Sequence, residues 1–439
     1  MNFAATMTSL IEQISTAPAE QVRFTQPLGD QFVVEKHQLV DWLDAQPLYP
    51  KFFWQDRQGD ECVAALGQMY TFHQPAPAYT ILAQHQRVWG GRAFSPISKG
   101  APRCLSSLFF LPIIELILQA GKWCLVVNTN RSRDDAIAAL NRLTFEIIPQ
   151  QCSTPKVLYA SHNPEQAQWD QLVEQALGEI EQDKFKKVVL ARKSTLEIAQ
   201  KVSAAAVMKA SIANNHDSFH FLFAMDAGHS FIGSTPERLY RRDDRVLLTE
   251  ALAGTIGRGV NDEQDQQLAQ WLAQDDKNLQ ENQYVVDDIV ERLTPLSECI
   301  EVEENTELIR LRRVQHLKRS IYAQLKDEVR GDKLLDALQP TAAVAGLPRE
   351  PSMQFIDQNE PFLRGWYAGS VGYLSHERAE FCVAIRSALV MDRTVHLFAG
   401  AGIVAGSKAE YEWQELDKKL ATLLTLLVEE KTEISGVCP

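Results

Sequence analysis

The chain has 439 residues, of which 45% are hydrophobic and 23% are charged, so it can bury one large core or two to three smaller ones. Its formal net charge of −13 at pH 7 argues against a binding surface for nucleic acid or for anionic lipid. An anionic ligand would have to be bound in a local basic pocket.

The N-terminal segment does not resemble an export signal, because it has no basic region and no sustained apolar stretch, and Glu12 lies within it. We therefore expect a cytoplasmic protein. The longest apolar stretch, residues 108–118, contains Pro112 and Glu115 and is too short to span a bilayer. It predicts a strand, followed after a turn by a second strand at residues 123–127.

The seven cysteines have no C-x-x-C or other metal-binding spacing, and their number is odd. This pattern is typical of reduced thiols and argues against a zinc or iron-sulfur site.

The pattern divides the chain into regions. Up to about residue 150 it predicts short strands with turns rich in Pro and Gly, including a strand and hairpin at residues 49–59. The polar residues 150–155 predict a boundary. We expect an N-terminal β-rich region over residues 1–155, a second region over residues 156–431 that is interlocked with the first and contains the candidate site residues, and a tail over residues 432–439.

Later elements alternate irregularly between strand and helix. Residues 164–183 predict a helix, residues 262–293 a long helix, and the last helix begins with an apparent capping box at Ser407 and Glu410. Strands are predicted at residues 187–192, 218–225, 230–233, 246–248, 369–374, 381–386 and 395–398. This irregular order predicts an α+β fold rather than a doubly wound sheet. No G-x-G-x-x-G or Walker motif opens a helix, which argues against nucleotide binding.

Two acids, Glu281 and Glu415, lie far apart in the sequence on strongly patterned helices. Glu415 shares one helix face with Glu412 and Lys419. A solvated face with an i,i+4 ion pair explains this spacing as well as a functional site does, and the acidic run around Glu281 is also typical of a surface. A hard cation such as Mg²⁺ needs few carboxylates, so two distant glutamates are enough for a metal site.

Lys187 opens a predicted strand and shares a face with Val189 and Ala191, so its stem is expected to lie over apolar surface. The neighbouring Lys184 and Lys186 make an exposed lysine an equally simple interpretation. An amine acts as a base only when it is neutral, and burial favours the neutral form. Lys187 is the best placed of the three lysines for that role.

Arg386 ends a predicted strand and needs an acidic partner, either a structural residue such as Glu380 or a ligand carboxylate held by two hydrogen bonds. The glycines of residues 399–403 permit an anion to approach backbone N–H groups. His316 is either a core histidine or a hydrogen-bond donor to a ligand.

Taken together, these segments resemble the chorismate-utilising enzymes, over roughly residues 165–430. The segments that carry the resemblance are residues 187–192, 234–239, 250–255, 276–281, 339–346, 367–372, 399–404 and 412–415. Within the family the chain is most similar to isochorismate synthases of the menaquinone pathway, because Glu250-Ala-Leu-Ala-Gly-Thr255 and the run Tyr49-Pro-Lys-Phe-Phe-Trp54 both match that type.

The resemblance implies an activity and a set of roles. It implies antiparallel sheets packed as a sandwich flanked by helices, and an isomerase that converts chorismate to isochorismate with Mg²⁺. It implies that Lys187 is the general base, Glu237 the general acid, and Glu281 and Glu415 the magnesium ligands. The substrate-binding residues that it implies are Gly254, Thr255, His316, Tyr367, Arg386, Gly400, Gly402 and Lys419. We expect a monomer without a glutaminase subunit.

Alternatives remain within and outside this activity. A salicylate synthase would share the base and acid and then eliminate pyruvate, and an isochorismate synthase could serve a siderophore pathway. Anthranilate-type enzymes typically have Pro-Ile where this chain has Ala251-Leu252. A chorismate-binding protein without catalysis is a further alternative. The chain departs from many relatives at Gln339, where they carry histidine, and in its alanine-rich residues 342–345.

Overall fold

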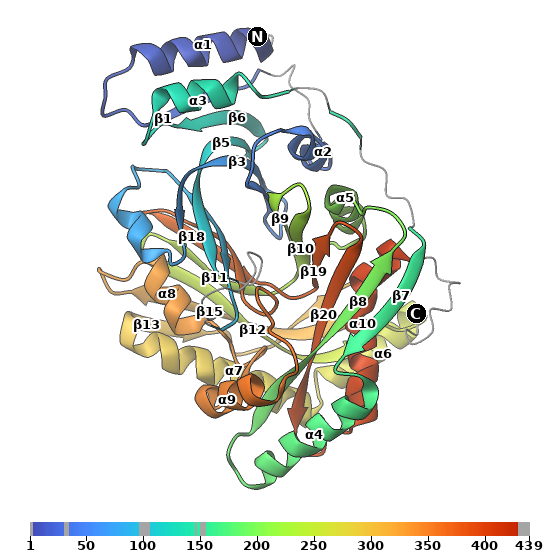
Figure 1. The fold of residues 1–439 in the computed structure, drawn as a ribbon. Helices are drawn as coiled ribbons and strands as arrows, with labels where there is room; N and C mark the ends of the chain where they lie inside the picture. Colours follow the sequence, from blue (N-terminus) through green and yellow to red (C-terminus); the bar gives the residue numbers. More distant parts are fainter. Residues whose placement is uncertain (1–2, 30–34, 96–105, 145–146, 150–154, 429–439) are drawn as a thin grey trace.

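The computed structural model describes residues 3–29, 35–95, 106–144, 147–149 and 155–428 (Figure 1). The strands are β1 (Arg23–Pro27), β2 (Lys51–Gln55), β3 (Glu61–Phe72), β4 (Val88–Arg92), β5 (Leu108–Gln119), β6 (Lys122–Asn128), β7 (Val157–Asn163), β8 (Lys187–Ile198), β9 (Phe219–Asp226), β10 (His229–Thr235), β11 (Arg238–Asp243), β12 (Val246–Gly257), β13 (Ser297–Val302), β14 (Glu307–Arg310), β15 (Val314–Leu325), β16 (Gly346–Leu347), β17 (Ser370–Leu374), β18 (Arg378–Val383), β19 (Ser387–Met391) and β20 (Thr394–Val404). The helices are α1 (Phe3–Thr16), α2 (Gln38–Ala45), α3 (Arg133–Leu140), α4 (Gln166–Glu181), α5 (Ala204–Asn214), α6 (Asp262–Leu272), α7 (Asp276–Leu293), α8 (Gly331–Leu338), α9 (Arg349–Asn359) and α10 (Ala409–Leu427).

The strands form one continuous antiparallel ladder in the described part of the chain. Its order is β7–β8–β20–β19–β10–β9–β2–β3–β5–β4–β17–β18–β11–β12–β15. Strands β13 and β14 both pair with β15, β16 pairs with β8, and β6 and β1 extend from β5. The predicted α+β class is confirmed, and strands from the N-terminal region lie between strands from the second half of the chain.

The ladder folds over itself, and aromatic side chains fill the space between its two layers. Phe223 of β9 stacks on Trp366, just before β17, with ring centroids 4.9 Å apart. Phe52 of β2 lies 5.3 Å from Trp89 of β4. All four side chains are buried. Strands that share no hydrogen bonds thus pack through large apolar side chains, which bury much surface and favour tilted or offset ring contacts. This is the predicted sandwich.

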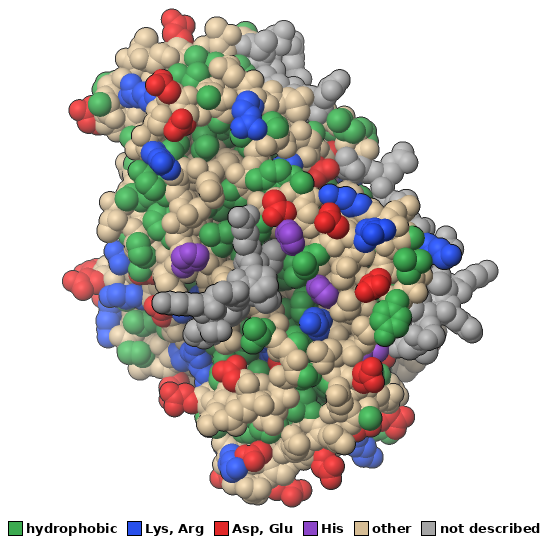
Figure 2. Space-filling model, viewed as in Figure 1, with side chains coloured by type: hydrophobic (Ala, Val, Ile, Leu, Met, Phe, Trp, Pro, Cys, Tyr) green, Lys and Arg blue, Asp and Glu red, His purple; other side chains and the backbone are tan. Residues whose placement is uncertain are grey.

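Helices cover the outer faces of the sandwich (Figure 1). Helix α7 packs against β12 and β15, and α10 packs against β20. Each of these helices buries an apolar stripe, which for α10 consists of Leu416, Leu420, Leu423, Leu424 and Leu427. The surface is polar instead: acidic and basic side chains are interspersed on the face shown in Figure 2. Among the described residues, none of the helices combines the length and apolar character that a membrane crossing requires.

Three local predictions are wrong. The predicted long helix is two helices, because Asp275 caps α7 by accepting a hydrogen bond from the Asn278 N–H and α6 ends at Leu272. The capping box of the last helix does not form: the Ser407 hydroxyl accepts the Val404 N–H instead, and Lys408 is the N-cap.

The third error concerns Arg386, which does not end a strand. Strand β18 stops at Val383, and Arg386 lies beyond it with a positive φ of 48°. The strand predicted over residues 381–386 therefore ends three residues early, at Val383. Strands β12 and β20 are longer than predicted, so the glycine segment 399–403 lies within a strand. The predicted boundary at residues 150–155, apart from Pro155, and the tail 432–439 lie outside the described residues.

A buried ion pair ties β8 to the segment around α9. Arg364 donates from Nε to Glu360 Oε2 at 2.7 Å and from Nη2 to the Val189 carbonyl at 2.6 Å. Glu360 also accepts the Ala191 N–H at 2.8 Å. Both side chains of the pair are 2% exposed, so each charge depends on the other for its compensation.

We expect Arg364→Ala to lower the free energy of unfolding by about 3–5 kcal/mol, because it leaves a buried carboxylate without its cation. Urea denaturation followed by circular dichroism measures the change. The control is Lys184→Ala, which removes a surface pair with Glu179 and should cost less than about 1 kcal/mol. Equal losses in the two variants would contradict the structural importance of the buried pair.

Candidate active site

Every residue predicted for the site lines one cavity of about 230 Å³. These residues are Lys187, Glu237, Gly254, Thr255, Glu281, His316, Tyr367, Arg386, Gly400, Gly402, Glu415 and Lys419. They come from β8, β12, β15, β20, α7, α10 and the segments around β10, β17 and β18. The fold thus brings together side chains that are separated by up to more than two hundred positions.

Lys187 enters the cavity from the first position of β8 and is 2% exposed. Its Nζ donates to Glu281 Oε1 at 2.6 Å. A Cβ atom at Gly402, on the paired strand β20, would lie 2.9 Å from Lys187 Cε, so the glycine makes room for the lysine stem. Lys184 and Lys186 are exposed instead. The prediction that Lys187 is the buried member of the three is confirmed.

Glu237 lies in the turn between β10 and β11 and is 5% exposed. Burial raises the pKa of its carboxyl to about 8, and the nearby charge of Glu250 acts in the same direction. Lys187, Arg386 and Lys419 oppose this rise in pKa without cancelling it. The carboxyl is therefore mainly protonated at neutral pH, which is the state that a general acid requires.

Glu281 on α7 and Glu415 on α10 both line the cavity, each beside a lysine. Glu415 Oε1 lies 2.5 Å from Lys419 Nζ. In the same way, Glu281 Oε1 lies 2.6 Å from Lys187 Nζ. Burial alone would raise the pKa of Glu415, but Lys419 and the other cations of the cavity lower it. The i,i+4 pair that the sequence suggested therefore exists, and it faces the cavity.

Glu412 also lines the cavity, and burial raises the pKa of its carboxyl. The described residues contain no cluster of three or more His, Cys, Asp or Glu side chains arranged to hold a metal ion. A cation bound between Glu281 and Glu415 would therefore depend on water or a ligand for its other oxygen donors.

His316 is a cavity residue rather than a core histidine. Its Nδ1 lies 2.8 Å from Thr255 Oγ1, directly across the β12–β15 pairing. Its buried Nε2 has no hydrogen-bond partner among the described residues. Burial, with Arg386 and Lys419 nearby, holds the pKa of His316 well below its usual range. The ring is thus neutral, and Nε2 is available to a ligand.

Gly254 adopts a positive φ of 85° at an irregularity in the β12–β15 register. A Cβ atom there would lie 3.1 Å from the Asn278 carbonyl oxygen, in the left-handed conformation that favours glycine. The neighbouring Thr255 N–H donates to Asn278 Oδ1 at 3.2 Å. The glycine therefore lets α7 approach β12 closely at the cavity wall.

Arg386 is buried, and no carboxylate among the described residues forms an ion pair with it. Glu380, the structural partner considered for it, pairs with Arg238 at 3.0 Å instead. A buried guanidinium at a cavity wall without an ion-pair partner among the described residues is suited to a ligand carboxylate.

Tyr367 forms the neighbouring wall and stacks on Phe398, with ring centroids 5.2 Å apart. Burial raises the pKa of Tyr367, so its hydroxyl remains a hydrogen-bond donor. A Cβ atom at Gly400 would lie 2.8 Å from that hydroxyl, and Lys419 donates to the Gly400 carbonyl at 2.8 Å. The glycine keeps space open beside the tyrosine.

Two charged residues beside the acid were not predicted. Glu250 lies on β12 and is 4% exposed, and Arg57 of the β2–β3 hairpin binds it through both terminal nitrogens, at 2.6 and 2.9 Å. Glu250 stood within a segment that carried the family resemblance, which was the available signal. Nothing in the local pattern around Arg57 indicated this contact.

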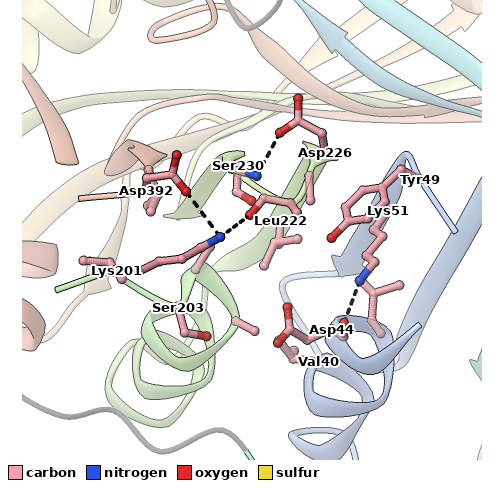
Figure 3. Close-up of a pocket in the computed structure, with 18 residues that line it drawn as sticks. Val40, Asp44, Tyr49, Lys51, Lys201, Ser203, Leu222, Asp226, Ser230 and Asp392 are labelled. Atoms are coloured by element: carbon pink, nitrogen blue, oxygen red, sulfur yellow. Dashed lines mark hydrogen bonds and ion pairs between the residues drawn. The ribbon is translucent and has the colours of Figure 1, made fainter. Parts of the chain in front are cut away.

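A larger hollow of about 460 Å³ lies elsewhere, between α2, β9, β10 and α5 (Figure 3). None of the predicted site residues lines it. Its lysines have local partners, because Lys201 turns to Asp392 at 3.3 Å and Lys51 donates to the Asp44 carbonyl in the last turn of α2 at 2.6 Å. Chemistry rather than size therefore identifies the site.

Comparisons with known proteins agree with this geometry. Residues 23–428 match the family model described as chorismate binding enzyme. The chain is 43% identical, over 91% of its length and 92% of the relative's, to isochorismate synthase MenF of Escherichia coli strain K12.

Solved structures give the same result. The structure of MenF, the menaquinone-specific isochorismate synthase from E. coli, matches with a TM-score of 0.88 at 40% identity, covering 97% of this chain and 99% of that one. Anthranilate synthase component I from Streptococcus pneumoniae matches with a TM-score of 0.67 at 20% identity over 93% of each chain, which supports the fold alone. The chain therefore belongs to the chorismate-binding enzyme family.

Proposed function

We propose that this chain is an isochorismate synthase, an isomerase that converts chorismate to isochorismate, and that the product serves menaquinone biosynthesis. The similar proteins named above support this activity. The observation that carries the proposal is a pair of buried groups in one cavity, the Lys187 amine and the Glu237 carboxyl with its raised pKa of about 8.

The chemistry requires a base and an acid that act together. The reaction moves a hydroxyl from C4 to C2 while the diene shifts, so the attacking water loses a proton and the departing hydroxyl gains one. We assign the first proton to Lys187 and the second to Glu237. One turnover leaves the lysine with an additional proton and the glutamate without one, and exchange with solvent restores both.

The remaining residues would hold the dianionic substrate. Arg386, Tyr367 and the backbone at Gly400 and Gly402 form a basic and hydrogen-bonding wall that suits a carboxylate. Gly254, Thr255 and His316 would line the ring, with His316 Nε2 as a hydrogen-bonding atom. Lys419 adds positive charge next to this set.

Glu281 and Glu415 would hold a divalent metal ion, which we propose to be Mg²⁺. The donor set fits, because it consists of two carboxylates from separate helices at one cavity, which leaves positions for water and for a substrate carboxylate. When bound, the ion would neutralise that carboxylate and withdraw electron density from the ring. Lys419, 2.5 Å from Glu415, balances the charge of that carboxylate. The Lys187 amine, which must be neutral to accept a proton, donates a hydrogen bond to Glu281.

We expect Lys187→Ala and Glu237→Gln each to reduce kcat by roughly 10²–10⁴-fold, because each removes one proton-transfer group. Mass spectrometry of products formed from chorismate measures turnover, and circular dichroism checks the fold. The exposed Lys184→Ala is the matched control. Turnover at the wild-type rate in either site variant would refute its assigned role, and salicylate with pyruvate among the products would indicate a salicylate synthase.

The pH dependence of kcat should report the acid. Glu237 donates a proton only when it is protonated, and its pKa is raised to about 8. Activity that depends on this group is therefore present below that pH and is lost as the pH rises through it. Initial rates between pH 6 and pH 10, at saturating chorismate and Mg²⁺, measure the limb. An alkaline limb near pH 4 to 5 would show that the acid has an ordinary carboxyl pKa.

Removal of the metal should abolish turnover, and Mg²⁺ should restore it. Glu281→Gln and Glu415→Gln are each expected to weaken Mg²⁺ binding, because each removes one of two carboxylate ligands. Isothermal titration with Mg²⁺ and chorismate gives a readout that does not depend on turnover. A wild-type affinity for Mg²⁺ in both variants would exclude these glutamates as its ligands.

A further inference from the structure

The turn that carries Glu237 is held from the N-terminal region. Arg57 lies between β2 and β3, and its Nη1 donates to the Pro236 carbonyl at 2.9 Å. Nη1 and Nη2 also bind the two oxygens of Glu250 at 2.6 and 2.9 Å. One guanidinium thus contacts the residue before the acid and a carboxylate on the strand beside it.

The backbone groups of this turn are satisfied in two ways. The Glu237 carbonyl accepts the Val383 N–H at 3.0 Å, and the Glu237 N–H donates to Thr235 Oγ1 at 3.3 Å. The first contact comes from β18 and the second from Thr235 within the turn. Both hold the backbone of Glu237 itself, and neither holds Pro236 or Arg238 on either side of it.

These two flanking residues depend on Arg57 and Glu250. The Arg238 N–H donates to Glu250 Oε1 at 3.1 Å, and the Pro236 carbonyl accepts from Arg57. Both groups flank Glu237 directly. Because a buried backbone group without a partner is costly, loss of this pair would release the turn at these flanking residues.

The Arg57–Glu250 pair is largely buried. The two side chains are 11% and 2% exposed, and the contact is bidentate, which restricts its geometry as well as strengthening it. The Phe219 ring lies beneath the guanidinium, 5.7 Å away. Arg57 is not among the residues that line the cavity.

We propose that Arg57 is a positioning residue for the acid of this site: it locks the Glu250 carboxylate and the Pro236 carbonyl and so fixes the turn that presents Glu237 to the substrate. The inference rests on the proposed function. It assigns to the N-terminal region an indirect part in catalysis, because that region supplies no group that reacts.

The same pair affects the protonation of the acid. Glu250 raises the pKa of Glu237, in addition to the larger effect of burial, whereas Lys187, Arg386 and Lys419 lower it. The Glu250 carboxylate therefore favours the protonated form of Glu237, whereas the three cations favour its ionised form. Replacing the pair by neutral side chains should lower the pKa of Glu237.

The first test compares Arg57→Gln and Arg57→Lys in the full chain. We expect Arg57→Gln to reduce kcat by roughly 10²-fold with little change in KM, because a small displacement of a catalytic group has an effect of this size. Arg57→Lys keeps the charge but not the two-nitrogen contact, and should restore kcat only in part. The matched control is Arg87→Gln. Arg87, just before β4, pairs with Glu61 at the start of β3, and the two side chains are 10% and 12% exposed. Neither residue lines the cavity.

The second test is the pH profile of the double variant Arg57→Gln/Glu250→Gln. Its alkaline limb should move to lower pH than that of the wild type, a change that a purely structural role would not produce. An Arg57→Gln variant with the kcat of the wild type, an equal loss of kcat in Arg87→Gln, or an unmoved limb in the double variant would overturn the inference. A wild-type chain that forms no isochorismate would instead overturn the proposed function.

Discussion

The pairing of β8 with β20 is the constraint on which the rest of the site depends. The two strands are in register along almost their whole length, so that Lys187, at the start of β8, lies opposite Val404, at the end of β20. This register places the lysine stem beside Gly402, and α10 begins a few residues after β20 ends. The amine, the glycine wall and the acid on α10 therefore keep fixed relative positions, although β8 and α10 are separated by more than two hundred residues in the sequence.

The cavity also shows how charges can be buried in a strongly acidic protein. Two lysines face two glutamates, one carboxyl is mainly protonated, and one guanidinium has no carboxylate partner among the described residues. Lys187 lies beside a glutamate that is 30% exposed and Lys419 beside one that is 38% exposed, so water still reaches these carboxylates. Protonation limits the cost of burial for Glu237. Arg386 remains as the buried cation without an ion-pair partner among the described residues, and it is suited to a ligand carboxylate. Local charge rather than net charge decides what this protein can bind.

Much of the fold was predictable because it follows local patterns. Alternation identified Lys187 as the buried lysine, and apolar runs identified β5 and β6. The break between α6 and α7 was not predicted, because the apolar spacing continues across it while a single capping aspartate ends the helix. The turn at Arg386 was also missed, since its positive φ has no signature in an arginine. The prediction that the site residues lie together rested on the family resemblance, because no local pattern indicates contacts between distant segments. The contact between Arg57 and Glu250 is an example.

The course of the ladder has a consequence for how the two parts of the sequence relate as physical units. Strand β2 pairs with β9, and β4 pairs with β17, so N-terminal strands are hydrogen-bonded into the middle of the sheet. A fragment that began after residue 155 would leave β9 and β17 as unpaired edges, which invite intermolecular association. Recombination between relatives at this point would have to preserve both the β2–β9 pairing and the β4–β17 pairing. The boundary that composition suggests thus divides the sequence, but strands from both sides of it belong to one sheet.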